Sequence, residues 1–188
     1  MKLHIQSLAG NQSRVLAGSA AGRKLLATLI DATPAATAPE KVFLDFIGIE
    51  VATVSFLRES VIGYRDFTRA SRQNIYPIIA NPEPAVVEEL EHLVKARNDV
   101  LWCCWLDAQD NTVRQQFIGE LDPAQRQTFD KVCELGMSTA PELADRFPDI
   151  GIGATAWNNR LSGLAAKGLL VETRQGKTKT FRPVLEGS

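Results

Sequence analysis

The feature that most constrains the fold of this chain is an alternation of short apolar segments with longer amphipathic ones over residues 1–118. Apolar runs at residues 41–47, 74–80 and 100–106 have the length of buried strands. The segment KLHIQSL, residues 2–8, has the period of two that is typical of a strand. Strands that alternate with helices predict an α/β fold, in which helices cover a central sheet.

Three helices are predicted between these strands. In the second of them, Leu57, Val61 and Tyr64 fall on one face at helical spacing, and Phe67 continues that face. The predicted helices cover residues 18–30, 54–67 and 83–98.

The end of this region predicts a mixed sheet. The run VLWCCWL, residues 100–106, is apolar throughout, as expected for a strand that is buried on both faces. A turn-rich segment separates it from TVRQQFI, residues 112–118, so these two strands could pair antiparallel while the earlier strands are parallel.

Residues 119–188 form the second predicted domain, and its helix boundaries are marked by capping residues. Asp122 and Pro123 begin a helix that Gly136 ends, with Phe129, Val132 and Cys133 predicted as its buried stripe. Thr139 and Glu142 have the spacing of a capping box, which predicts the start of a second helix.

A third helix is predicted over residues 154–168, followed by strands at 169–174 and 178–184. Trp157, Leu161 and Leu164 recur at helical spacing and should face the core. The opposite side is small, polar and almost uncharged. Such side chains can hydrogen-bond to base edges in a major groove, so we predict base reading by Thr155, Asn158, Asn159 and Ser162.

The charge of the chain is unevenly distributed, although its net value is −1. Residues 151–185 carry a net charge of about +5, whereas residues 119–150 carry about −4. This distribution is typical of a domain that places one side on phosphates. The residues predicted to bind phosphate are Arg160, Arg174, Lys177, Lys179 and Arg182.

The C-terminal region resembles the winged helix-turn-helix domains of bacterial transcriptional regulators. The resemblance rests on Glu-Leu-Ala at 142–144, Asn-Arg-Leu at 159–161 and Lys-Gly-Leu-Leu at 167–170. It implies that the third helix binds in the major groove of double-stranded DNA and that the following hairpin, the wing, contacts the backbone or the minor groove. Winged helices also serve as protein-docking modules, which is the alternative for this domain.

The N-terminal region resembles STAS-like domains, relatives of the anti-sigma-factor antagonists. The resemblance rests on VFLDFIGIEVATVSFLRE, residues 42–59, in which Ser-Phe-Leu opens a helix after a strand that ends in Leu-Asp-Phe. It implies that Ser55 could accept a phosphate from a kinase-like ATPase partner. The antagonists have an Asp-Ser pair where this chain has Val54 before Ser55, so we favour a structural role for Ser55 as the N-cap of its helix.

Other polar residues do not form a recognisable catalytic or metal site. Asp45 ends a predicted strand without an identifiable acid or base beside it and should cap the following loop, and His4 and His92 are isolated. Cys103 and Cys104 lie in an apolar strand and predict buried, reduced thiols. We therefore expect no enzyme activity, metal or cofactor.

These features predict a cytoplasmic DNA-binding regulator with domains 1–118 and 119–188. No apolar segment has the 18 or so residues that span a bilayer, and the N-terminus lacks the apolar core of a signal peptide. A homodimer is expected, because two copies would bind paired half-sites. The main alternative is a signalling adaptor in which both domains bind proteins, including a histidine-kinase-like ATPase. A third alternative is an enzyme that acts through the α/β domain, which would require a pocket beside Asp45 with a second titratable group.

Overall fold

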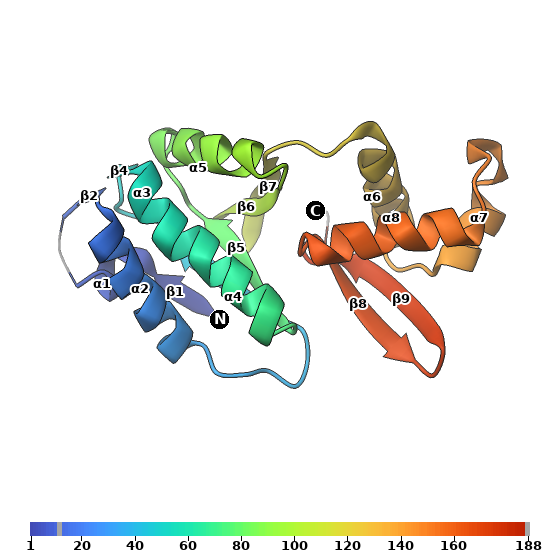
Figure 1. The fold of residues 1–188 in the computed structure, drawn as a ribbon, viewed down its shortest axis with the longest axis horizontal. Helices are drawn as coiled ribbons and strands as arrows, with labels where there is room; N and C mark the ends of the chain where they lie inside the picture. The colour runs from blue at the N-terminus through green and yellow to red at the C-terminus, as the bar shows by residue number, and fades with distance from the viewer. Residues whose placement is uncertain (11–12, 187–188) are drawn as a thin grey trace. The chain divides into compact units, whose positions relative to one another are not determined.

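The computed structural model describes residues 1–10 and 13–186. The chain divides into two compact units, Met1–Glu120 and Leu121–Ser188, which are described separately below (Figure 1).

The first unit is built on a mixed five-stranded sheet, as the sequence predicts. Four parallel strands lie in the order β1-β3-β5-β6, and β7 pairs antiparallel with β6 at one edge. A separate parallel pair is formed by β2 and β4. The strands are β1 Lys2–His4, β2 Val15–Leu16, β3 Glu40–Asp45, β4 Val51–Ala52, β5 Ile75–Ala80, β6 Leu101–Leu106 and β7 Thr112–Ile118.

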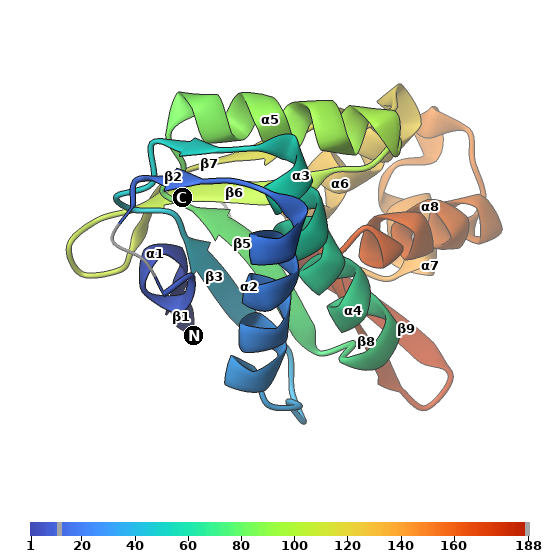
Figure 2. The ribbon, with the colours of Figure 1, turned by 60° about the vertical axis from the view of Figure 1, so that its left-hand side comes forward.

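The long helices of this unit lie on one face of the sheet (Figures 1 and 2). In the order β1-β3-β5-β6, each new parallel strand is added at the same edge of the growing sheet. Right-handed crossovers between such strands put the connecting helices on one face of the sheet. Leu44, Ile79 and Cys103 of the strands pack with Leu29, Leu57 and Leu90 of the helices in the core. The helices are α1 Ile5–Leu8, α2 Ser19–Ala32, α3 Val54–Leu57, α4 Gly63–Ser71 and α5 Pro84–Ala96.

The predicted strand over residues 2–8 is wrong in its second half. β1 ends at His4, and the chain turns at once into the short helix α1, which buries Ile5. Period-two alternation over so few residues cannot distinguish a strand from one helical turn.

The predicted helix over residues 54–67 is interrupted by a π-helical turn, Arg58–Ile62, between α3 and α4. The extra residue of a π turn rotates the positions of the following side chains about the helix axis by about 100°, the angle of one residue in an α-helix. Leu57, Val61 and Tyr64 are buried as expected, but Phe67 is only half-buried and Arg65 lies on the buried face.

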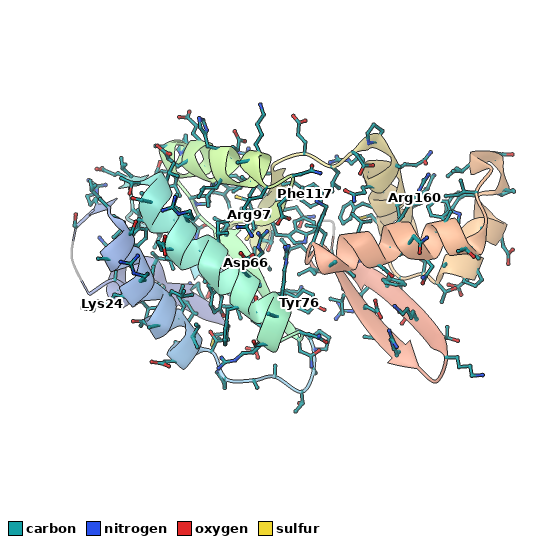
Figure 3. All side chains as sticks on the ribbon, viewed as in Figure 1. Lys24, Asp66, Tyr76, Arg97, Phe117 and Arg160 are labelled. Atoms are coloured by element: carbon teal, nitrogen blue, oxygen red, sulfur yellow. The ribbon has the colours of Figure 1, made fainter. Side chains whose placement is uncertain are left out.

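Arg65 is held by a group of ion pairs that we call the Arg65 cluster, made of Arg65, Asp66, Arg69, Arg97 and Asp99. The Arg65 side chain is 3% exposed, and its guanidinium nitrogens lie 2.5 Å from Asp99 Oδ2 and 3.1 Å from Asp66 Oδ1. Asp99 also forms an ion pair with Arg69. Asp66 forms one with Arg97, and these two residues are labelled in Figure 3. Burial raises the pKa of Asp99, but the charges of Arg65 and Arg69 outweigh it and hold that pKa below its usual value.

The second unit contains three helices, a 3-10 turn and an antiparallel hairpin. The predicted caps are confirmed: Asp122 accepts a hydrogen bond from Gln125 N, Gly136 ends the first helix with φ 73°, and Thr139 and Glu142 form a capping box. The elements are α6 Pro123–Leu135, α7 Ala140–Arg146, the turn Pro148–Ile150, α8 Ala154–Ala166, β8 Leu170–Gln175 and β9 Thr178–Pro183.

The predicted buried stripe of α6 needs one correction. Phe129 and Val132 are buried, but Cys133 is exposed, and Thr128 takes the third inward position. The Thr128 hydroxyl donates to Ala124 O at 2.8 Å, which allows a polar side chain to lie inside. None of the described helices of either unit combines the length and apolar character that crossing a bilayer requires.

Candidate nucleic-acid interface

The helix α8 presents one apolar and one polar side. Trp157, Leu161 and Leu164 are 0% exposed and pack in the core of the second unit, where α8 contacts α6, α7 and β8. Gly151, with φ 72°, turns the chain into this helix, and Gly153 stands at its N-cap. The buried side therefore fixes which residues of α8 face outward.

The outer side of α8 carries the residues predicted to read bases. At 100° per residue, Thr155, Asn159 and Ser162 lie opposite Trp157. Thr155 and Asn159 are exposed, whereas Ser162 and Asn158 on the flank are half-buried. Thr155 and Asn159, one turn apart, are thus the most accessible polar groups of the four.

Arg160 does not share this outer side. It lies near the apolar side of α8, where its Nη1 donates to Gln127 Oε1 of α6 at 3.4 Å and its guanidinium carbon is 5.9 Å from the centre of the Trp157 ring (Figure 3). The structure therefore separates Arg160 from the other predicted phosphate-binding residues and places it between two helices.

The hairpin β8–β9 brings two of the predicted phosphate-binding residues together. Arg174 and Lys179 are direct partners in the antiparallel register, so their side chains leave the same face of the hairpin. Lys177 follows Gly176 in the turn and is exposed. Arg182 pairs with Val171 in the register, and this places it on the other face of the hairpin. Its guanidinium lies 3.7 Å from Glu186.

Glu172 lies between the two paired cations. Its Oε1 accepts from Arg174 Nε at 3.2 Å and is 2.9 Å from Lys179 Nζ. Partial burial raises the pKa of Glu172, but the hydrogen bonds from Lys179 and Arg174 outweigh it, so that the pKa is lower than usual. The sequence shows Glu172 as the one acid among the cations of residues 151–185, but only the hairpin register reveals which cations it contacts.

Ser55 is not the N-cap of its helix. Thr53 holds that position, and its Oγ1 accepts from Phe56 N at 3.4 Å and from Gly18 N at 3.3 Å. Ser55 lies in the first turn of α3, half-buried, with its hydroxyl 3.2 Å from Thr53 Oγ1. The expected capping role was assigned two residues too late, because both residue types cap helices and the sequence does not fix the start of the helix.

Asp45 and His4, which the sequence left without partners, form a pair at the carboxyl ends of the parallel strands. They are neighbours in the register of β1 and β3, and His4 Nδ1 lies 3.0 Å from Asp45 Oδ2. Asp45 Oδ1 accepts from Ile47 N and from Asn81 Nδ2, and Asn81 Oδ1 accepts from Leu106 N. Asp45 is 2% exposed, and its hydrogen bonds and ion pair link the ends of four strands.

No metal site is found in the described part of the chain, and the two adjacent cysteines of β6 are buried. No three His, Cys, Asp or Glu side chains among residues 1–10 and 13–186 are placed to hold a metal ion. Cys103 and Cys104 are buried and form no disulfide, and burial raises the pKa of each thiol to about 12. These two cysteines are therefore protonated, unreactive thiols at neutral pH.

Comparisons with known proteins found no match to this chain among protein families, curated proteins or solved structures.

Proposed function

We propose that this protein is a DNA-binding transcriptional regulator in which residues 119–188 form a winged helix-turn-helix domain and residues 1–118 a STAS-like domain that senses a signal or docks a partner. In this proposal α8 enters the major groove and the hairpin β8–β9 is the wing. Copies of the chain would pair on DNA as a homodimer.

The observation that carries the proposal is the outer side of α8. A helix with a fixed apolar side exposes Thr155 and Asn159 one turn apart, without a charged residue between them on that side. Both side chains can donate and accept hydrogen bonds, and Asn can form a bidentate pair with adenine. The adjacent hairpin supports this reading, because Arg174, Lys177 and Lys179 lie on or near one of its faces, where phosphates could be bound.

A second candidate function is a protein-binding adaptor with a kinase-like ATPase partner. It is favoured by the exposed apolar pair Val15 and Val51, which are neighbours in the register of β2 and β4 and are 49% and 40% exposed. The strand β4 leads directly into the helix that carries Ser55. Apolar side chains exposed next to each other are a common feature of protein-docking surfaces.

The deciding experiment is selection of bound sequences from a random duplex library, followed by salt titration of the selected site. A Lys177→Ala/Lys179→Ala double variant should reduce the slope of log K against log salt by about 2, because two phosphate contacts are lost. The matched control is Lys24→Ala/Lys95→Ala, which removes two exposed lysines from the first unit and should leave the slope unchanged.

Failure to enrich any sequence, together with the absence of salt-dependent binding, would refute the DNA-binding proposal. The protein-binding adaptor would then be tested by measuring the affinity of a purified kinase-like ATPase for the wild type and for a Val15→Asp variant.

A further inference from the structure

The hairpin β8–β9 contains a negative charge at the place where a phosphate would have to bind. Arg174 and Lys179 leave the same face of the hairpin as direct register partners, and the Glu172 carboxylate contacts both of them. Glu172 is the one acid in the sequence from Leu170 to Pro183. A phosphate that bridges these two cations would occupy the position of this carboxylate.

The contacts of Glu172 are accessible enough to be exchanged. The side chains of Glu172 and Lys179 are 26% and 28% exposed, and that of Arg174 is 65% exposed. Ion pairs at such positions contribute little to stability, whereas charge-assisted hydrogen bonds to phosphate are among the stronger polar contacts. The backbone of the hairpin does not depend on the pair, because β8 and β9 are joined by their own ladder and by the Thr173–Thr180 hydroxyl contact of 2.6 Å.

We propose that Glu172 is an affinity-determining residue that competes with DNA phosphates for Arg174 and Lys179. This inference rests on the proposed function and adds to it that the hairpin binds phosphate only by exchanging one anion for another. Lys177, which is exposed at the turn, would make the first contact with the DNA backbone. Glu172 then leaves the two cations as the phosphate replaces it.

Competition between Glu172 and phosphate is tested with the variant Glu172→Gln, which keeps the shape of the side chain and removes its charge. Affinity for the selected duplex at a fixed salt concentration should rise about three- to tenfold, with a steeper salt slope. The matched control is Glu134→Gln on α6, which also removes one negative charge and one lysine pair, that with Lys131, but lies outside the hairpin. The control should change affinity less than twofold.

A cycle of two variants tests whether the effect passes through the named cation. Lys179→Ala should weaken binding more in the Glu172→Gln background than in the wild type, because Lys179 is fully available for phosphate only when Glu172 is neutral. Equal losses in the two backgrounds would overturn the competition.

A measurement without DNA separates this inference from the proposed function. Inorganic pyrophosphate is titrated into the full chain while the Nε–H resonance of Arg174 is followed by NMR. Tighter pyrophosphate binding by Glu172→Gln than by wild type and Glu134→Gln would support the competition, even if no DNA sequence were enriched. Equal pyrophosphate binding by all three proteins would overturn it, even if DNA binding were established.

Discussion

Two groups of charged residues in this protein have similar composition and opposite environments. The Arg65 cluster of the first unit places a guanidinium that is 3% exposed between two aspartates, whereas Glu172 in the second unit holds two cations at the surface. Removing charge from a buried pair leaves an uncompensated ion, but removing it from an exposed pair lets water take its place. We therefore expect the ion pairs of the Arg65 cluster to stabilise the fold of the first unit, and those of Glu172 in the second unit to be exchangeable without loss of the fold.

The largest expected effect is the loss of the buried guanidinium. Arg65→Leu should lower the free energy of unfolding of the first unit by about 3–5 kcal/mol, because Asp99 would stay largely buried without its nearest cation. Native-state hydrogen exchange of the protected sheet amides measures this loss. Arg97→Leu, which breaks the half-exposed pair with Asp66, is the control and should cost less than about 1 kcal/mol. Equal losses in the two variants would contradict the distinction between buried and exposed pairs.

A smaller effect is expected at the carboxyl ends of the parallel strands. Asp45→Ala should destabilise the first unit by about 2 kcal/mol, because Ile47 N and Asn81 Nδ2 would lose their buried acceptor. Asp45→Asn retains an acceptor oxygen and should recover most of that stability. Urea unfolding of the three proteins provides the comparison, and a loss in the Asn variant as large as in the Ala variant would show that the charge, not the hydrogen bonds, matters.

In the second unit, the corresponding large effect should appear in binding and not in stability. Asn159→Ala should reduce discrimination at one base pair of the selected duplex by about 1–3 kcal/mol and leave the unfolding curve unchanged, because its side chain is exposed. The measurement is a competition between single-base variants of the site. Thr178→Ala removes an exposed hydroxyl from the hairpin and should leave base preference as it is.

The smallest effect concerns the pH range in which Glu172 keeps its two partners. Because the pKa of Glu172 in the folded protein is lower than its ordinary 4.5, the ion pairs stabilise the hairpin above about pH 4.5 and lose that effect as the pH falls through the folded value. Carboxyl ¹³C NMR should give a midpoint below 4.5, and Lys179→Ala should move it upward. A midpoint at or above 4.5 in the wild type would contradict the contacts of Glu172 with Arg174 and Lys179.

The features that were predicted correctly from the sequence are those that depend on residues close together in the chain. The start of α6 at Asp122 and Pro123 and the capping box of Thr139 and Glu142 each depend on residues within one helical turn. The mixed sheet and the apolar side of α8 also followed from local periodicity.

What the sequence could not predict depends on contacts between distant segments. The pairing of His4 with Asp45 requires the register of two strands about 40 residues apart, and no local pattern fixes that register. The contacts of Glu172 depend in the same way on the pairing of β8 with β9. Arg160 was grouped with the phosphate-binding residues by its charge, but its position on α8 directs it to Gln127.

The π turn at Arg58–Ile62 also has an evolutionary consequence. Loss of a single codon within it would restore a continuous α-helix and turn every later residue of α4 by about 100°, which would carry Arg65 away from Asp99. The extra residue and the Arg65–Asp99 pair must therefore be inherited together. In any lineage of this protein that has lost the extra residue, we expect Arg65 or Asp99 to be replaced as well.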